Sequence, residues 1–141
     1  MEGPRFYIFA AVQTAAVAAL LWLIFSRPGP WDLQREVGAG FTIAGICGIV
    51  AARYQLGRSF AIKAEARQLV TNGIYSRIRN PIYVFGMIML AGVALMLHRP
   101  ILWLFLPLIA VMQITRARRE AAVLEAAFGD AYREYRRRTW F

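Results

Sequence analysis

The sequence contains little of the chemistry from which most active sites are built. Its 141 residues include one cysteine, Cys47, and one histidine, His98. One cysteine excludes a disulfide within the chain and a cysteine-based metal site. One histidine cannot make a zinc site without other ligands, and no carboxylate stands at a suitable spacing, so we expect no metal. There is also no serine–histidine–carboxylate set and no phosphate-binding glycine loop.

Charge is almost absent from four long stretches, in which Arg53 is the only charged residue. A helix needs about 20 residues to cross the hydrocarbon of a membrane, with a range of about 17–25. We therefore predict an all-α membrane protein, a single membrane domain over 1–141 with about four transmembrane helices. The alternative, a soluble bundle of very apolar helices, would leave little polar surface for water. The predicted spans are 6–25, 37–55, 81–97 and 100–115.

Negative charge is also scarce, and the formal net charge is +9. The basic residues concentrate in the connector 56–80 and in the tail 116–141. The positive-inside rule places both segments in the cytoplasm, together with both termini, and we expect the inner (plasma) membrane. Nucleic-acid binding would also suit this charge. Basic cytoplasmic flanks are ordinary in small membrane proteins, however, so we expect no nucleic-acid partner.

The tail has a different pattern from the spans. Four apolar residues fall on one helical face, and Gly129 is a typical helix stop. Tyr132 and Tyr135 begin a second short apolar face. We predict amphipathic cytoplasmic helices that dock on the ends of the spans. The first face consists of Val123, Leu124, Ala127 and Phe128.

Small residues are frequent in the second predicted span. Glycines let helices approach closely, which favours tight helix packing within the chain or a homodimer. These glycines are Gly38, Gly40, Gly45 and Gly48.

The polar stretch LVTNGIYSRIRNPIY, Leu69–Tyr83, separates two apolar runs. It ends in Arg79 and Asn80, and Pro81 suits the first turn of a helix. Arg116 and Glu120 stand four residues apart on one helical face of the tail. An interfacial salt bridge would explain that pair. Because both segments are predicted on one side of the membrane, a site for a zwitterionic ligand explains the whole set.

This stretch, followed by a helical hairpin and RARREAAVLEAAFGDAYREY, resembles the integral-membrane methyltransferases that act on isoprenylcysteine carboxylates and on phospholipids. The resemblance covers Leu56 to the end. It implies S-adenosylmethionine (SAM) as cofactor, held by the connector and the tail helix and not by a Rossmann fold. It implies catalytic roles for Arg116, which faces the acceptor, for Glu120 and for Arg79, whose role is catalytic or structural. The implied cofactor contacts are Arg67, Gln68, Leu69, Val70, Tyr75, Asn80, Pro81, Ile82, Tyr83 and Glu120.

Two departures from the family pattern bear on the substrate. Asn80 stands where many members have a histidine, so a proton-shuttling role is not expected there. Ala121 stands where many have a second glutamate. We expect the acceptor to be a lipid or another lipophilic small molecule. The absence of an obvious base favours a carboxylate or a thiolate, and the resemblance makes an isoprenylcysteine-type carboxylate the first candidate. A phospholipid amine, a quinone-like lipid and a small thiol stay open as acceptors.

Two further classes of protein stay open at this stage. Sterol-type reductases that use NADPH resemble the C-terminal half, although they are usually much longer. A small transporter or lipid-binding scaffold would also have short spans and a basic face. Charges within the spans would mark a transport path, and Arg53, near the end of the second, is the only one present.

Overall fold

The computed structural model describes residues 4–62 and 69–141, and it confirms the predicted all-helical architecture. The described residues form five α-helices and one 3₁₀ helix, η1. They contain no strand, only an isolated parallel bridge between Ile78 and Trp140. The elements in chain order are α1 (Pro4–Phe25), α2 (Leu33–Ile62), η1 (Gly73–Ser76), α3 (Pro81–Leu97), α4 (Ile101–Phe128) and α5 (Asp130–Arg138).

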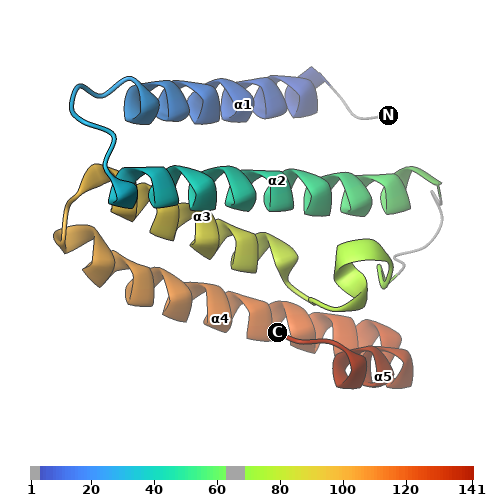
Figure 1. Ribbon diagram of the computed structural model, residues 1–141. Coiled ribbons are helices and arrows are strands. Elements are labelled where there is room, and N and C mark those ends of the chain that lie inside the picture. The colour runs from blue at the N-terminus through green and yellow to red at the C-terminus, as the bar shows by residue number, and fades with distance from the viewer. Residues whose placement is uncertain (1–3, 63–68) are drawn as a thin grey trace.

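The four long helices run side by side, as Figure 1 shows, with α2 and α3 in the middle and α1 and α4 at the edges. The turns 26–32 and 98–100 lie at one end of this array. The last turns of α2, η1 and α5 lie at the other end (Figure 1). The two basic segments of the sequence are therefore at the same end of the molecule.

Helices α2 and α3 form the most extensive contact in the fold. Glycines make it possible: a Cβ built on Gly38 would lie 2.7 Å from the Gly92 carbonyl oxygen, and one on Gly45 would lie 2.6 Å from the Met89 nitrogen. A Cβ built on Gly48 would approach the ring of Phe85 more closely still. The close packing predicted for this helix is thus confirmed at three glycines. At Gly40 a Cβ would meet nothing within 4 Å among the described residues, so packing of this glycine against a second copy stays a prediction.

Two helices run further than the predicted segments. α2 begins at Leu33 because Asp32 Oδ1 accepts a hydrogen bond from the Arg35 backbone N–H at 2.8 Å, a typical helix cap. α2 continues to Ile62, so the predicted connector 56–80 starts within a helix.

Helix α4 passes Arg116 without a break and ends at Phe128, so 116 is no helix boundary. Residues 116–128 are mostly good helix formers without proline or glycine, which explains the continuity. Gly129, with φ of 53°, ends α4, as its sequence position predicted.

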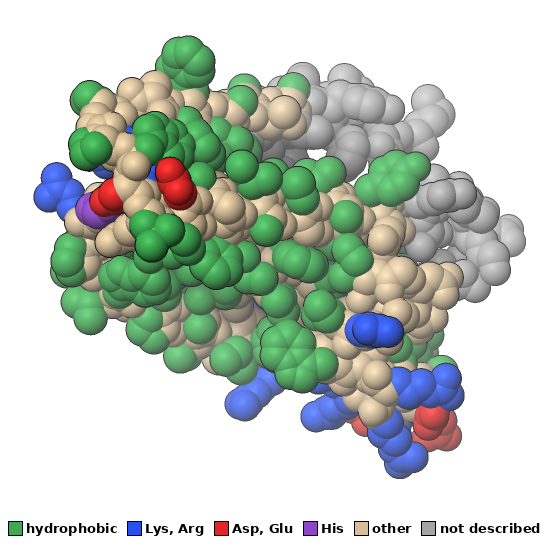
Figure 2. Space-filling view, viewed as in Figure 1, with side chains coloured by type: hydrophobic (Ala, Val, Ile, Leu, Met, Phe, Trp, Pro, Cys, Tyr) green, Lys and Arg blue, Asp and Glu red, His purple; other side chains and the backbone are tan. Residues whose placement is uncertain are grey.

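Two helical stretches are long and apolar enough to cross a membrane, Leu33–Gly57 and Ile101–Phe128, as judged over the residues whose side chains are described. Pro81–Leu97 is apolar but shorter. Many large apolar side chains point outward, including Leu104, which is 68% exposed, and Met112, which is 63% exposed. Figure 2 shows apolar side chains covering the middle of the molecule, with charged side chains gathered at both ends, most of them near α5. Four spans stay a prediction.

Candidate functional site

Three predicted site residues meet between α3 and α4. The Tyr83 hydroxyl donates a hydrogen bond to Glu120 Oε1 at 2.7 Å. Arg116 Nε donates to the same oxygen at 3.1 Å. We call Tyr83, Arg116 and Glu120 the Glu120 cluster. The side chain of Arg116 is 74% exposed and that of Glu120 is 46% exposed, so a ligand can reach both.

The start of α3 sets the position of Tyr83. Pro81 occupies the first turn and is fully buried, which fixes where the helix begins. Two residues further on, Tyr83 falls within the first turn, where its hydroxyl reaches Glu120 on α4. Asn80 stands at the N-cap position, yet its side chain makes no capping hydrogen bond. Its amide is therefore left for another partner.

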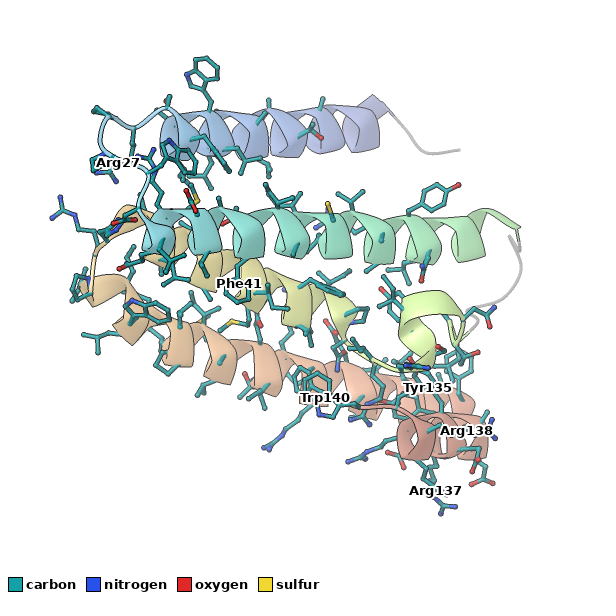
Figure 3. All side chains as sticks on the ribbon, viewed as in Figure 1. Arg27, Phe41, Tyr135, Arg137, Arg138 and Trp140 are labelled. Carbon is teal, nitrogen blue, oxygen red and sulfur yellow. The ribbon has the colours of Figure 1, made fainter. Side chains whose placement is uncertain are left out.

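Tyr75 is held against α5 by a hydrogen bond. It is buried in η1, and its carbonyl oxygen accepts a hydrogen bond from the Tyr135 hydroxyl at 2.7 Å. Tyr135 lies between α5 and η1, whereas Arg137 and Arg138 point away from the helices (Figure 3). Burial raises the pKa of the Tyr135 hydroxyl to about 12, and the neighbouring Tyr132 adds to this rise. Burial also raises the pKa of Tyr75.

The residues after α5 pair with the connector before α3. The Trp140 backbone N–H donates to the Arg77 carbonyl at 2.7 Å, and the Arg79 N–H donates to the Trp140 carbonyl at 3.0 Å. The Asn80 N–H donates to the Phe141 carbonyl at 2.9 Å. This backbone ladder attaches 77–80 to the end of the tail. No pattern in the sequence indicated it, because two paired residues are too short for a strand signal.

A cavity of about 330 Å³ lies between the connector, α4 and α5. Three arginines line it, and no carboxylate does. We call this cavity the arginine pocket. Sequence reasoning placed Arg79 and Asn80 in a site, but it missed the other residues that form this pocket. The lining residues are Arg79, Asn80, Ile114, Ala117, Arg118, Ala121, Tyr132, Arg136 and Phe141.

The remaining predicted contacts are less closely grouped. Leu69 and Val70 lie half-buried before η1, and Ile82 lies half-buried in α3. Among the described residues, no hydrogen bond connects these three to the Glu120 cluster. Arg67 and Gln68 lie outside the residues that the structure describes.

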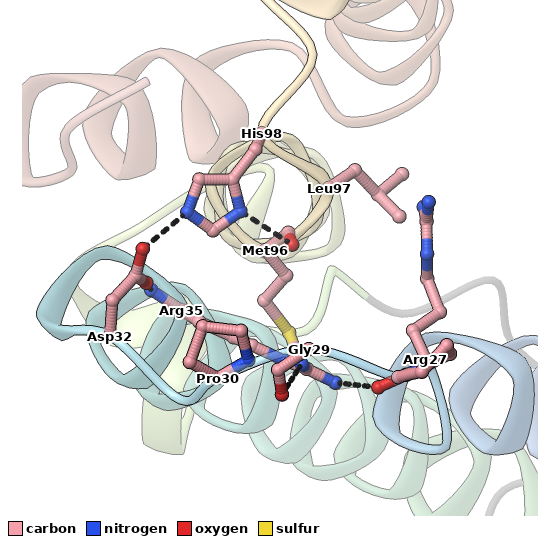
Figure 4. Close-up of a pocket in the computed structure, with 9 residues that line it drawn as sticks. Arg27, Gly29, Pro30, Asp32, Arg35, Met96, Leu97 and His98 are labelled. Atoms are coloured by element: carbon pink, nitrogen blue, oxygen red, sulfur yellow. Dashed lines mark hydrogen bonds and ion pairs between the residues drawn. The ribbon is translucent and has the colours of Figure 1, made fainter.

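A second cavity, of about 300 Å³, lies at the opposite end of the helices. Figure 4 shows Arg35 at its base, where the guanidinium donates to backbone carbonyls at the end of α1. His98 Nε2 lies 2.8 Å from Asp32 Oδ2 and joins the turn after α3 to the start of α2. Arg35 also stacks 4.4 Å from the Trp31 ring. These polar groups are thus occupied with one another, and they join the turn after α1, the start of α2 and the turn after α3.

The fold and the site are those of a helical membrane protein with a polar site at one end of its apolar helices. The chain belongs to the phospholipid methyltransferase family, whose family model matches residues 33–131. It is 36% identical over 121 residues to the protein-S-isoprenylcysteine O-methyltransferase of Schizosaccharomyces pombe (strain 972). That comparison covers 77% of this chain and 48% of the relative, so the chain spans about half the length of the curated relative it matches. No solved structure matches the chain.

Proposed function

We propose that this protein is an integral-membrane methyltransferase that transfers a methyl group from SAM to an isoprenylcysteine-type carboxylate. The observation that carries the proposal is the Glu120 cluster, in which residues from the connector side of α3 and from α4 meet as the resemblance requires. The family and the yeast relative supply the reaction class.

The residues present fit the cofactor. Tyr83 and Arg116 both bind Oε1 of Glu120, which leaves Oε2 without a hydrogen bond among the described residues. A carboxylate oxygen of this kind accepts hydrogen bonds from an amino or a hydroxyl group. The Asn80 amide, free of a capping role, offers both a donor and an acceptor at the start of α3, three residues before Tyr83. When bound, SAM supplies a methyl group on a positively charged sulfur.

Arg116 is the residue suited to the acceptor. Its guanidinium uses Nε for Glu120 and is otherwise exposed. The two remaining nitrogens can hold a carboxylate through charge-assisted hydrogen bonds. A carboxylate is already ionised near neutral pH, so no base has to remove a proton from it. Alignment of the reacting groups alone can lower a barrier by roughly 7–11 kcal/mol.

We propose further that the helices form four spans, with the connector, the tail and both termini in the cytoplasm. The net charge of +9 and the meeting of both basic segments at one end support this orientation. The acceptor would then enter from the lipid and the cofactor from the cytoplasm. Labelling of single engineered cysteines from either side of the membrane, in a Cys47→Ser background, tests the orientation.

The decisive experiment combines binding and turnover in purified full-length protein. Calorimetric titration with S-adenosylhomocysteine measures binding, and tritiated SAM with a farnesylcysteine acceptor measures methyl transfer. We expect both signals to be lost in Glu120→Gln and kept in Glu36→Gln, the same change at the other end of the molecule. Thermal stabilisation by NADPH, without binding of S-adenosylhomocysteine, would contradict the proposal.

A phospholipid amine is the second candidate acceptor, because the family whose model matches is that of phospholipid methyltransferases. Such an amine must lose a proton before it attacks, a step that a carboxylate acceptor does not need. Tritium recovered in membrane phospholipids and not in the prenylcysteine ester would identify this acceptor.

A further inference from the structure

We propose that the arginine pocket is a second binding site, separate from the Glu120 cluster, and that it takes a phosphate anion. The ligand is either the phosphate of an anionic phospholipid headgroup or a free phosphate. Three guanidinium groups, those of Arg79, Arg118 and Arg136, converge on the cavity without a lining carboxylate.

Arg79 provides the clearest sign of a missing partner. Its Nε is buried and is the only buried side-chain nitrogen or oxygen without a hydrogen bond in the described part of the chain. A buried charged donor without a partner is costly, so such a group normally faces a ligand. Arginine binds phosphate through two parallel hydrogen bonds, which makes phosphate a suitable partner.

The other two arginines of the pocket have no close carboxylate partner. Arg133 and Arg138 each approach a carboxylate to within 2.9 Å. Arg136 lies 3.9 Å from Glu125, a long ion pair. Arg118 has no ion pair with any described carboxylate. Arg119 likewise has no ion pair with a described carboxylate, and Arg137 lies 4.0 Å from Glu134. Arg118 and Arg136 differ from these two in that they line the cavity together with Arg79.

Arg118, which lines the pocket, lies on a different face of α4 from the Glu120 cluster. Arg118 stands two positions from both Arg116 and Glu120, and at about 100° per residue this turns it to the opposite helix face. The pocket also lies where the apolar part of α4 ends, since Thr115 is followed directly by charged residues. That is the depth at which headgroup phosphates are found, and a basic surface there attracts anionic lipid.

The test uses full-length protein in a neutral detergent at fixed ionic strength. The probes are dioctanoyl-phosphatidylglycerol, dioctanoylglycerol and sodium phosphate, titrated by calorimetry. The pocket variant is the double substitution Arg118→Gln and Arg136→Gln. The matched control is Arg119→Gln with Arg137→Gln, which removes the same charge from exposed neighbouring positions.

We expect phosphatidylglycerol to bind and dioctanoylglycerol not to bind. The pocket variant should lose about tenfold or more in affinity, whereas the control should change less than about twofold. Displacement of the lipid by sodium phosphate supports a free anion as ligand. Pocket-dependent lipid binding that phosphate does not displace supports a headgroup. Equal losses in both double variants, or no loss in the pocket variant, overturn the proposal.

A third variant guards against loss of folding as the cause. Ala121 lines the pocket, so Ala121→Glu places a carboxylate among the arginines. We expect this variant to unfold at a higher temperature and to lose phosphatidylglycerol binding, a combination that misfolding cannot produce. Binding of S-adenosylhomocysteine, measured on the same samples, reports on the Glu120 cluster, which contains neither Arg118 nor Arg136, so the two proposals are tested by different ligands.

Discussion

Tyr83 and Glu120 lie 37 positions apart in the sequence and share a hydrogen bond of 2.7 Å between α3 and α4. Arg116, one turn before Glu120, donates to the same carboxylate oxygen. The bond fixes the first turn of α3 to the middle of α4, at the point where the apolar part of α4 ends. It thus determines where the carboxylate of Glu120 presents its second oxygen.

Removal of the Tyr83 hydroxyl should loosen this carboxylate. A hydrogen bond to a charged group contributes about 1.5–3 kcal/mol, and Tyr83→Phe leaves Arg116 as the only partner of Glu120 Oε1. We expect the affinity for S-adenosylhomocysteine to fall about tenfold, with little change in thermal stability because the site is exposed. Tyr54→Phe, at a position that is 67% exposed on α2, is the control. Unchanged affinity in Tyr83→Phe would show that the cluster is only structural.

Local patterns in the sequence predicted several parts of the molecule. Proline at the start of a helix located the beginning of α3 at Pro81, and Gly129 located the end of α4. The spacing of Arg116 and Glu120 predicted their contact, since residues four apart are neighbours on a helix. In each case a residue or a fixed spacing within one helix carries the information.

The parts that were not predicted depend on contacts between distant segments. The backbone pairing of Arg77 and Arg79 with Trp140 involves N–H and carbonyl groups that every residue has, so side-chain identity does not indicate it. The arginine pocket depends on how α5 turns back after Gly129, which no local pattern specifies. The continuation of α2 to Ile62 was missed because the predicted boundary followed charge and not helix formation.

Close packing of α2 on α3 predicts that glycines of one helix respond differently to the same substitution. A Cβ at Gly45 would lie 2.6 Å from the backbone nitrogen of Met89, which cannot move aside cheaply. We expect Gly45→Ala to destabilise the fold by about 1–3 kcal/mol, the usual cost of overpacking. Gly40→Ala meets nothing and should be neutral or stabilise by up to about 1 kcal/mol. Thermal unfolding in detergent compares the two, and equal melting temperatures would contradict the helix contact.

We expect the folded protein to lose stability in alkaline solution because of the buried hydroxyl of Tyr135. Burial raises its pKa from 10.0 to about 12, so the folded state favours the neutral phenol. The contribution of Tyr135 to the free energy of unfolding is fully present below pH about 10, and it is lost as the pH rises toward about 12. In Tyr135→Phe the loss over this range should be smaller. The variant should also be less stable by about 1 kcal/mol at neutral pH, because the Tyr75 carbonyl loses its donor. Urea unfolding at a series of pH values measures both, and Tyr54→Phe should follow the unmodified protein.

We expect the attachment of α1 to the rest of the fold to depend on the side chain of Arg35. Arg35 is only 4% exposed, and its guanidinium donates to four carbonyl oxygens, two in the last turn of α1 and two in the turn after it, at distances of 2.8–3.5 Å. Arg35→Ala removes both these hydrogen bonds and a positive charge at the C-terminal end of the helix, which should cost about 3 kcal/mol. The carbonyls belong to Ile24, Phe25, Arg27 and Gly29.

The measurement is limited proteolysis of the 26–32 segment together with thermal unfolding. Arg35→Lys keeps the charge but lacks the planar fork that reaches several carbonyls, so it should recover only part of the stability. Arg99→Ala, an exposed arginine in the turn at the same end, should leave cleavage unchanged. If Arg35→Ala is cleaved no faster than Arg99→Ala, the carbonyl contacts of Arg35 do not hold α1 in place.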